Sequence, residues 1–130
     1  MRQAREGAWL IARSLWELCR YDLMIRVFGF RHAIQGSGRA RLGKACRGRD
    51  LENRVCDAMN WALSLYWKRV LCLQRSLATA RLLRSCGLDA SVVIGCRPEP
   101  FTSHAWVEID GRVVNDSPGY QKLLCVLERI

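Results

Sequence analysis

Three residues of this sequence have side chains suited to nucleophilic catalysis, and they occur in the order Cys72, His104 and Asp116. A cysteine thiolate attacks carbonyl carbons, a histidine transfers protons near neutral pH, and a carboxylate can hold the histidine in the useful tautomer. These residue types in this order are typical of acyl transfer through a covalent intermediate. They are far apart in the sequence, so the fold must bring them together.

The segment that begins at Cys72 has the pattern of a helix with one buried face. Apolar residues recur at helical spacing and the pattern stops before Gly87, as expected for a glycine after a helix C-terminus; the apolar positions are Leu73, Leu77, Ala80 and Leu83. Cys72 is therefore expected at the helix N-terminus. Unpaired N–H groups and the helix dipole favour a thiolate there.

His104 and Asp116 lie on either side of a turn at Asp110-Gly111. A three-residue loop, 109–111, would place His104 directly opposite Asp116 on one face of a hairpin. A two-residue loop would put them on opposite faces. The sequence permits both loops, and the three-residue register is our hypothesis because it lets the two side chains meet.

Four segments around these residues, 72–78, 82–87, 92–95 and 104–111, resemble the transglutaminase-like leader peptidases of lasso-peptide biosynthesis. The resemblance covers about the C-terminal half and extends loosely over the N-terminal helices. It implies that Cys72 is the nucleophile, His104 the base and Asp116 the residue that orients the histidine. It also implies a cysteine peptidase that removes the leader from a ribosomal precursor before a partner cyclase closes the lasso ring.

The resemblance implies an α+β fold in which N-terminal helices pack on a transglutaminase- or papain-like core. One helix of this core carries the nucleophile beside a small antiparallel sheet. The 130 residues fit a single domain. Within it we expect residues 1–49 to form a helical and basic recognition segment and residues 50–130 to form the catalytic core.

Residues 8–30 have the pattern of an amphipathic helix, and charged residues interrupt them too often for a signal peptide or a membrane span. One stripe of this helix is apolar and consists of Trp9, Ala12, Trp16, Cys19, Leu23 and Val27. We expect this stripe to pack against the catalytic half or against a partner protein. Contact with a membrane surface is the less favoured interpretation.

The region between residues 30 and 50 is rich in glycine, arginine and lysine and is expected to be a basic loop that could hold an acidic partner or the leader peptide. His32 is interpreted as a solvated residue of this loop. A second helix is expected from Asp50 to about Val70, and its buried face is expected to consist of Leu51, Val55, Ala58, Met59, Ala62, Leu65 and Tyr66. The apolar segment 120–130 is expected to pack on the sheet, as either a helix or a strand.

Seven cysteines without a C-x-x-C pair argue against a disulfide framework and a zinc site, and they fit a reducing cytoplasm. Cys96, expected in a loop near the site, is the rival nucleophile, but it lacks a helix N-terminus. No phosphate-binding glycine motif or metal-ligand cluster occurs, so no cofactor or metal is expected. Any ATP dependence would belong to the cyclase.

Two other functions are compatible with the sequence. A transglutaminase or other acyltransferase would use the same three residues with an amine in place of water. The net charge of +9 would suit a nucleic-acid-binding module, but no recognised motif supports one, so no nucleic acid is expected.

The resemblance also implies the partners. Longer family members carry a leader-binding domain, and the first 50 residues here lack its pattern of strands and helices. We therefore expect a separate small leader-binding protein, together with the precursor leader peptide and the lasso cyclase.

Overall fold

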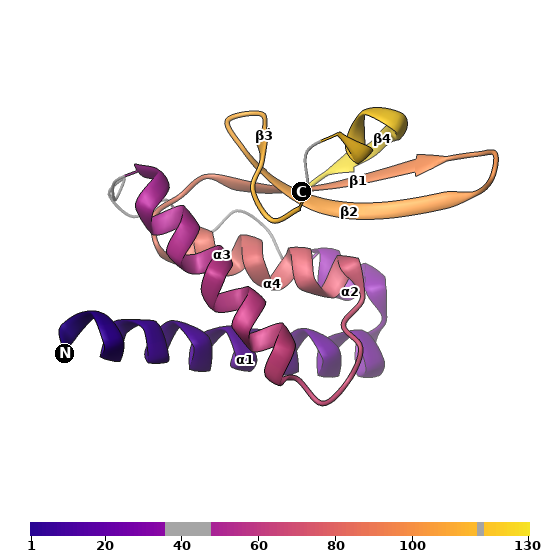
Figure 1. Cartoon of the computed structure of the whole chain (residues 1–130). Coiled ribbons are helices and arrows are strands. Elements are labelled where there is room, and N and C mark those ends of the chain that lie inside the picture. The colour runs from indigo at the N-terminus through magenta and orange to yellow at the C-terminus, as the bar shows by residue number, and fades with distance from the viewer. Residues whose placement is uncertain (36–47, 117–118) are drawn as a thin grey trace.

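The computed structural model describes residues 1–35, 48–116 and 119–130. Helices and a small sheet form separate layers, with the sheet on one side of α4 and α1 on the other, while α3 crosses α1 (Figure 1). This arrangement confirms the α+β prediction. The elements are α1 (Arg2–Phe28), α2 (Phe30–Gln35), α3 (Gly48–Leu65), α4 (Cys72–Ser85), β1 (Ala90–Arg97), β2 (Thr102–Ile109), β3 (Arg112–Val113), the 3-10 helix η1 (Tyr120–Leu123) and β4 (Cys125–Arg129).

Helix α4 is the centre of the hydrophobic core. It contacts α1, α3, β1 and β2, and Leu77, Leu82 and Leu83 on it are fully buried. It ends before Gly87, whose φ of 86° lies in the left-handed region that favours glycine. The predicted helix and its glycine termination are therefore confirmed.

The strands form one antiparallel sheet in the order β3-β2-β1-β4. In the long β1–β2 hairpin, Gly95 lies opposite His104. The C-terminal segment, whose type the sequence left open, becomes η1 and the edge strand β4. Cys96 lies within β1 and not in a loop, which corrects the sequence-based expectation.

Most of the apolar stripe expected on the first helix faces outward, and only Cys19 of its residues packs against the core. Trp9, Trp16 and Leu23 have exposed fractions of 58%, 63% and 63%. The expectation that this stripe packs on the catalytic half is therefore wrong for all of its residues except Cys19, and its contact with a partner stays a prediction. The face that packs on the core contains Leu10, Ser14, Glu17, Leu18 and Tyr21.

The sequence did not indicate the buried face of α1, because this face contains the polar residues Ser14 and Glu17, whose partners lie within α1 and, for Glu17, also on α4. Ser14 donates a 2.8 Å hydrogen bond to the carbonyl oxygen of Leu10. The buried carboxylate of Glu17 pairs with Arg13, with Arg20 and, from α4, with Arg81 at 3.4 Å. These ion pairs offset part of the desolvation free energy that burial of the carboxylate costs.

Helix α3 begins two residues before Asp50 and ends at Leu65, earlier than the expected end near Val70. Its predicted buried face is largely correct, because Val55, Ala58, Met59 and Ala62 are buried. Leu65 is exposed instead. His32 is exposed, as predicted, but it lies in α2 and not in a loop. The rest of the predicted basic loop, residues 36–47, lies outside the described residues.

Within the described residues, no helix is both long enough and apolar enough to span a lipid bilayer.

Candidate active site

Cys72 is the first residue of α4, as predicted, and its side chain is partly exposed. The preceding residue, Leu71, is extended, and its side chain does not cap the helix. The first intrahelical bond runs from the Arg75 N–H to the Leu71 carbonyl oxygen at 3.0 Å. Cys72 therefore lies at the end of α4 where the dipole is positive, and no side chain of Leu71 caps this end.

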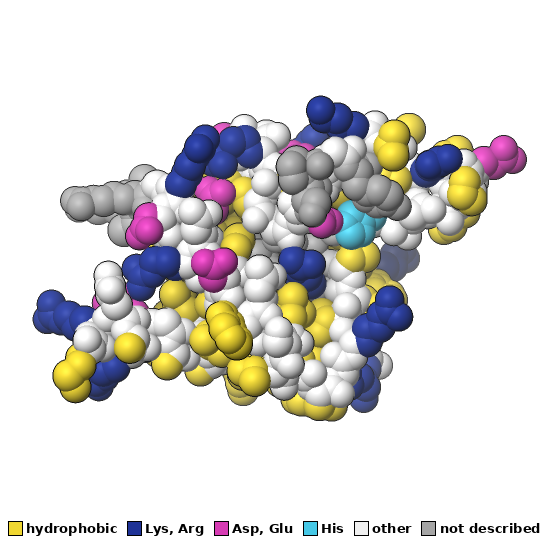
Figure 2. Space-filling view, in the orientation of Figure 1, with side chains coloured by type: hydrophobic (Ala, Val, Ile, Leu, Met, Phe, Trp, Pro, Cys, Tyr) yellow, Lys and Arg dark blue, Asp and Glu magenta, His cyan; other side chains and the backbone are white. Residues whose placement is uncertain are grey.

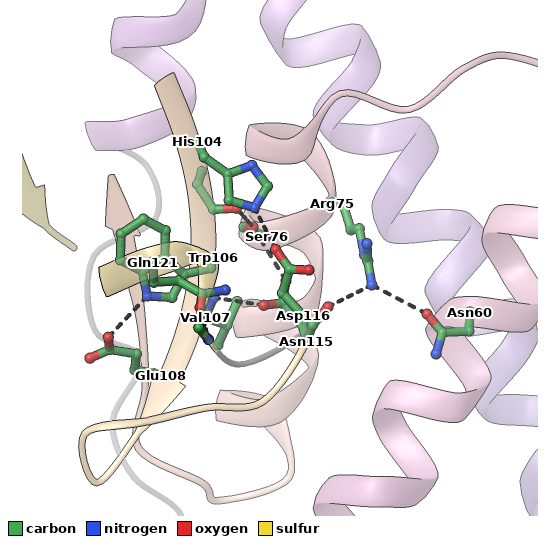
Figure 3. Close-up of polar contacts among 12 residues, drawn as sticks. Asn60, Arg75, Ser76, His104, Trp106, Val107, Glu108, Asn115, Asp116 and Gln121 are labelled. Carbon is green, nitrogen blue, oxygen red and sulfur yellow. Dashed lines mark hydrogen bonds and ion pairs between the residues drawn. The ribbon is translucent and has the colours of Figure 1, made fainter. Parts of the chain in front are cut away.

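His104 and Asp116 are brought together by the fold. The Nε2 atom of His104 contacts the Oδ2 atom of Asp116, and Figure 3 shows the two side chains pointing toward one another. Both side chains are about one-quarter exposed, 24% for His104 and 28% for Asp116. The pair is therefore held within the structure and can still be reached by a substrate.

The hairpin that carries this pair does not have the register we expected. Ile109 pairs with Arg112 and Glu108 with Val113, so the loop contains only Asp110 and Gly111. Both loop residues have positive φ, 52° and 75°, which is the type I′ turn that suits the right-handed twist of a hairpin. The three-residue register is therefore wrong.

The two side chains meet because the chain leaves the sheet. Val114 still pairs through its N–H with the Val107 carbonyl oxygen at 3.0 Å. The N–H of Val107 then bonds to the side-chain oxygen of Asn115, at 2.8 Å, in place of a backbone carbonyl. The chain bends at Asn115 and Asp116, and this bend brings Asp116 to His104 (Figure 3).

Helix α4 holds this bend in place. Arg75 donates a 2.6 Å hydrogen bond to the backbone carbonyl of Asn115, and the Asn115 amide donates to the Ser76 hydroxyl at 3.3 Å. Ser76 in turn donates a 3.0 Å bond to the carbonyl oxygen of Ala105, next to His104. Ser76 lies one turn after Cys72 on the same helix face. One short set of hydrogen bonds therefore connects the helix of Cys72 to both other candidate residues.

Sequence reasoning missed Arg75, Ser76 and Asn115. Their roles depend on the bend after β3, which no local pattern encodes. The available signal was weak: Ser76 is a small polar residue four positions after Cys72 and next to the buried Leu77.

A cavity of about 620 Å³ lies between α3, α4 and the bend, and Asp116 forms part of its wall. Arg75 and Thr79 also line it, and they lie three and seven positions after Cys72, on the same face of α4. The Arg75 Nε atom is buried without a hydrogen-bond partner in the described residues. The remaining lining residues are Asn53, Cys56, Asp57, Met59, Asn60, Val114 and Asn115.

Two other candidate groups have different surroundings. Burial raises the pKa of the Cys56 thiol to about 11, with the Glu52 and Asp57 carboxylates adding to the rise, so this cavity thiol stays protonated near neutral pH. The Gln74 amide, in the first turn of α4, donates a 2.8 Å hydrogen bond to the Leu18 carbonyl oxygen. Its structural role is therefore to join α4 to α1.

No group of three or more His, Cys, Asp or Glu side chains is placed to hold a metal ion in the part of the chain that the structure describes.

The fold and the site together consist of a central helix that begins at Cys72 and an antiparallel sheet that carries His104, which is paired with Asp116. Residues 15–128 match the family model of the Transglutaminase-like superfamily, and the chain belongs to this superfamily. It is also similar to the Microcin J25-processing protein McjB of Escherichia coli, with 48% identity over 59 residues. That match covers 45% of this chain and 28% of the relative's length. No solved structure matches the chain.

Proposed function

We propose that this protein is a cysteine peptidase that removes the leader from a ribosomal lasso-peptide precursor. The observation that carries the proposal is the His104–Asp116 pair, tied by hydrogen bonds through Ser76 to the helix that begins at Cys72. Membership of the superfamily supports a cysteine-dependent reaction. The processing role named for the relative McjB supports the precursor as the substrate class.

In the first step the Cys72 thiolate attacks the carbonyl carbon of the scissile peptide bond, forming a thioester with the leader. The C–N bond breaks, and His104 protonates the amine of the leaving core peptide. Because Nε2 faces Asp116, the proton would move through Nδ1 of the ring. The Cys72 backbone N–H is the natural donor to the negatively charged oxygen of the tetrahedral intermediate.

In the second step His104 accepts a proton from water, and the resulting hydroxide attacks the thioester. The leader leaves with a new carboxylate, and the Cys72 thiolate is restored. Asp116 holds the imidazole in the same orientation in both steps. The core peptide then has a free amine, which a partner cyclase can use for ring closure.

The polar cavity beside Asp116 is the site that we assign to the substrate next to the scissile bond. The exposed stripe of α1, together with the basic segment around Arg39, Arg41 and Lys44, would meet the leader and its separate binding protein. The three basic residues lie outside the described residues. Two weak contacts joined by one precursor raise the effective concentration of substrate at the site.

The test is incubation of the precursor and its leader-binding protein with the wild-type chain, with Cys72→Ala, or with Cys96→Ala as the matched control. Product masses are measured, and circular dichroism checks that each variant is folded. We expect leader and core products whose summed mass exceeds the mass of the precursor by one water. These products should be absent only with Cys72→Ala. Cleavage by folded Cys72→Ala would reject the assigned nucleophile, and products joined to an amine would show the acyltransferase alternative.

A further inference from the structure

Two cysteines outside the candidate active site face each other across neighbouring strands. In the β1–β4 pairing, Cys96 lies directly opposite Cys125. Directly opposed residues of antiparallel strands project from the same face, with Cα atoms about 4.5–5.5 Å apart. A disulfide requires a Cα separation of about 4.4–6.8 Å. The backbone therefore already places these two residues within disulfide range.

Both thiols are free, and an oxidant can reach them. Cys125 is exposed and Cys96 is partly exposed. The other four described cysteines lie in helices or, for Cys86, at a helix end, and none of them faces a cysteine across a strand pair. The opposed pair is therefore distinct from Cys72, the candidate nucleophile.

We propose that Cys96 and Cys125 form a reversible dithiol–disulfide site, with a small-molecule disulfide such as glutathione disulfide as the oxidant. The more exposed Cys125 thiolate attacks the oxidant, forming a mixed disulfide and releasing one glutathione thiol. The Cys96 thiolate then attacks the Cys125 sulfur and releases the second thiol. Two electrons and two protons pass from the protein to the oxidant, which is released as two glutathione thiols.

The position of the pair gives the bond a specific structural effect. It would join the edge strand β4 to β1 and close a loop that contains both His104 and Asp116. A cross-link of this kind restricts the unfolded chain and raises the melting temperature. The inference rests on strand register and exposure alone, so it stands or falls independently of the proposed peptidase activity.

The linkage can be mapped in the full-length protein. Trypsin does not cut efficiently at Arg97-Pro98, so Cys86 and Cys96 would fall in the same tryptic peptide, 85–112, whereas Cys125 falls in peptide 123–129. A Cys86→Ser variant makes the assignment unique. This variant is equilibrated in reduced and oxidised glutathione, its remaining thiols are alkylated, and the digest is analysed by mass spectrometry without reduction.

We expect the intact oxidised protein to be lighter by two hydrogen atoms, peptides 85–112 and 123–129 to be joined, and Cys72 to be alkylated. The wild-type melting temperature should rise by several degrees on oxidation and return on reduction. Cys125→Ser, a change at an exposed position, should show no rise. Glutathione adducts without a cross-link, a link to another cysteine, or a cross-link without a change in melting temperature would overturn the inference.

Discussion

Ser76 of α4 donates a 3.0 Å hydrogen bond to the carbonyl oxygen of Ala105, the residue that follows His104. Strand β3 pairs with β2 at Glu108 and Ile109 and ends before it reaches this carbonyl. A hydroxyl from the helix that begins at Cys72 therefore takes the place of a strand partner. The same hydroxyl accepts a bond from Asn115, which precedes Asp116.

Replacing Ser76 should therefore affect both stability and catalysis. Ser76→Ala leaves a buried carbonyl and the Asn115 amide without their partner, which should cost about 1–3 kcal/mol in the free energy of unfolding. The substitution also removes the hydrogen bonds that position the backbone next to His104 and Asp116. We therefore expect kcat to fall while KM changes less. Ser64→Ala is the matched control, since Ser64 makes the same kind of bond on an exposed helix surface and should change stability by less than about 0.5 kcal/mol. Equal losses in the free energy of unfolding, measured in urea, would contradict the role assigned to the Ser76 hydrogen bonds.

Asp116 and Asp110 should respond differently to the same change. Asp116→Asn removes the charge that orients His104 and should lower kcat by about 10³- to 10⁴-fold, as expected for a carboxylate that fixes the tautomer. Asp110 lies in the exposed turn with a φ of 52°, a conformation that asparagine adopts readily, so Asp110→Asn should keep both stability and turnover. Single-turnover cleavage rates give the comparison. Similar losses from both variants would remove Asp116 from its assigned role.

Gly95 should not tolerate even one added carbon. A Cβ atom at this position would lie 2.8 Å from Cη2 of Trp106 and 3.1 Å from Cβ of Leu124. Trp106 is fully buried and cannot move away without disturbing its neighbours. Gly95→Ala should therefore lower the free energy of unfolding by about 1–3 kcal/mol. Gly7→Ala, where the added carbon meets no atom within 4 Å, provides the control for thermal denaturation.

The buried thiol of Cys56 should make the protein less stable in alkali. Burial raises its pKa in the folded state from 9.0 to about 11. The unfolded chain ionises first, so this stabilisation is complete below about pH 9 and is lost as the pH rises toward 11. The loss should approach about 2 kcal/mol at pH 11. The free energy of unfolding is measured in urea across this pH range for the wild type and for Cys56→Ala, and subtracting one series from the other removes the contribution of the other titrating groups. A difference between the two free energies that does not change with pH would contradict the prediction.

The exposed stripe of α1 can be tested separately from catalysis. Trp16→Glu places a charge on a residue that is 63% exposed, so folding should be unchanged. Affinity for the leader-binding protein should fall at least tenfold, because a desolvated tryptophan is a typical interface anchor. Trp61→Glu on α3, also at 63% exposure, is the control. Normal binding by the Trp16 variant in calorimetry would assign the stripe to another partner, including a membrane surface. Figure 2 shows apolar side chains reaching the surface along α1 at the lower edge of the view.

The sequence predicts the parts of this fold that depend on local periodicity. The helix from Cys72 to its glycine termination and the buried face of α3 follow from apolar spacing, and both are present. The contact between His104 and Asp116 was also predicted, although through the wrong register. Residue spacing specified that the two side chains could meet but left open how the chain would bring them together.

Two of the errors, the buried face of α1 and the register after β2, arise where side-chain contacts made in the fold override the local pattern. The outward stripe of α1 is more apolar than its buried face, yet Glu17 is buried because its carboxylate pairs with Arg13, with Arg20 and, from α4, with Arg81. Likewise, Asn115 ends the β2–β3 pairing because its side chain takes the place of a backbone carbonyl. Neither event leaves a periodic signal in the surrounding residues.

Strand β4 lies at the edge of the sheet, and all of its residues are exposed. Val126 and Leu127, with exposed fractions of 46% and 65%, make this edge apolar as well as open. An edge of this kind is a template for a strand from another molecule. The practical consequence is a limit on concentration: stored or overexpressed protein should self-associate at β4 before it unfolds, and a charged residue on this strand would extend the range of concentrations in which the monomer can be studied.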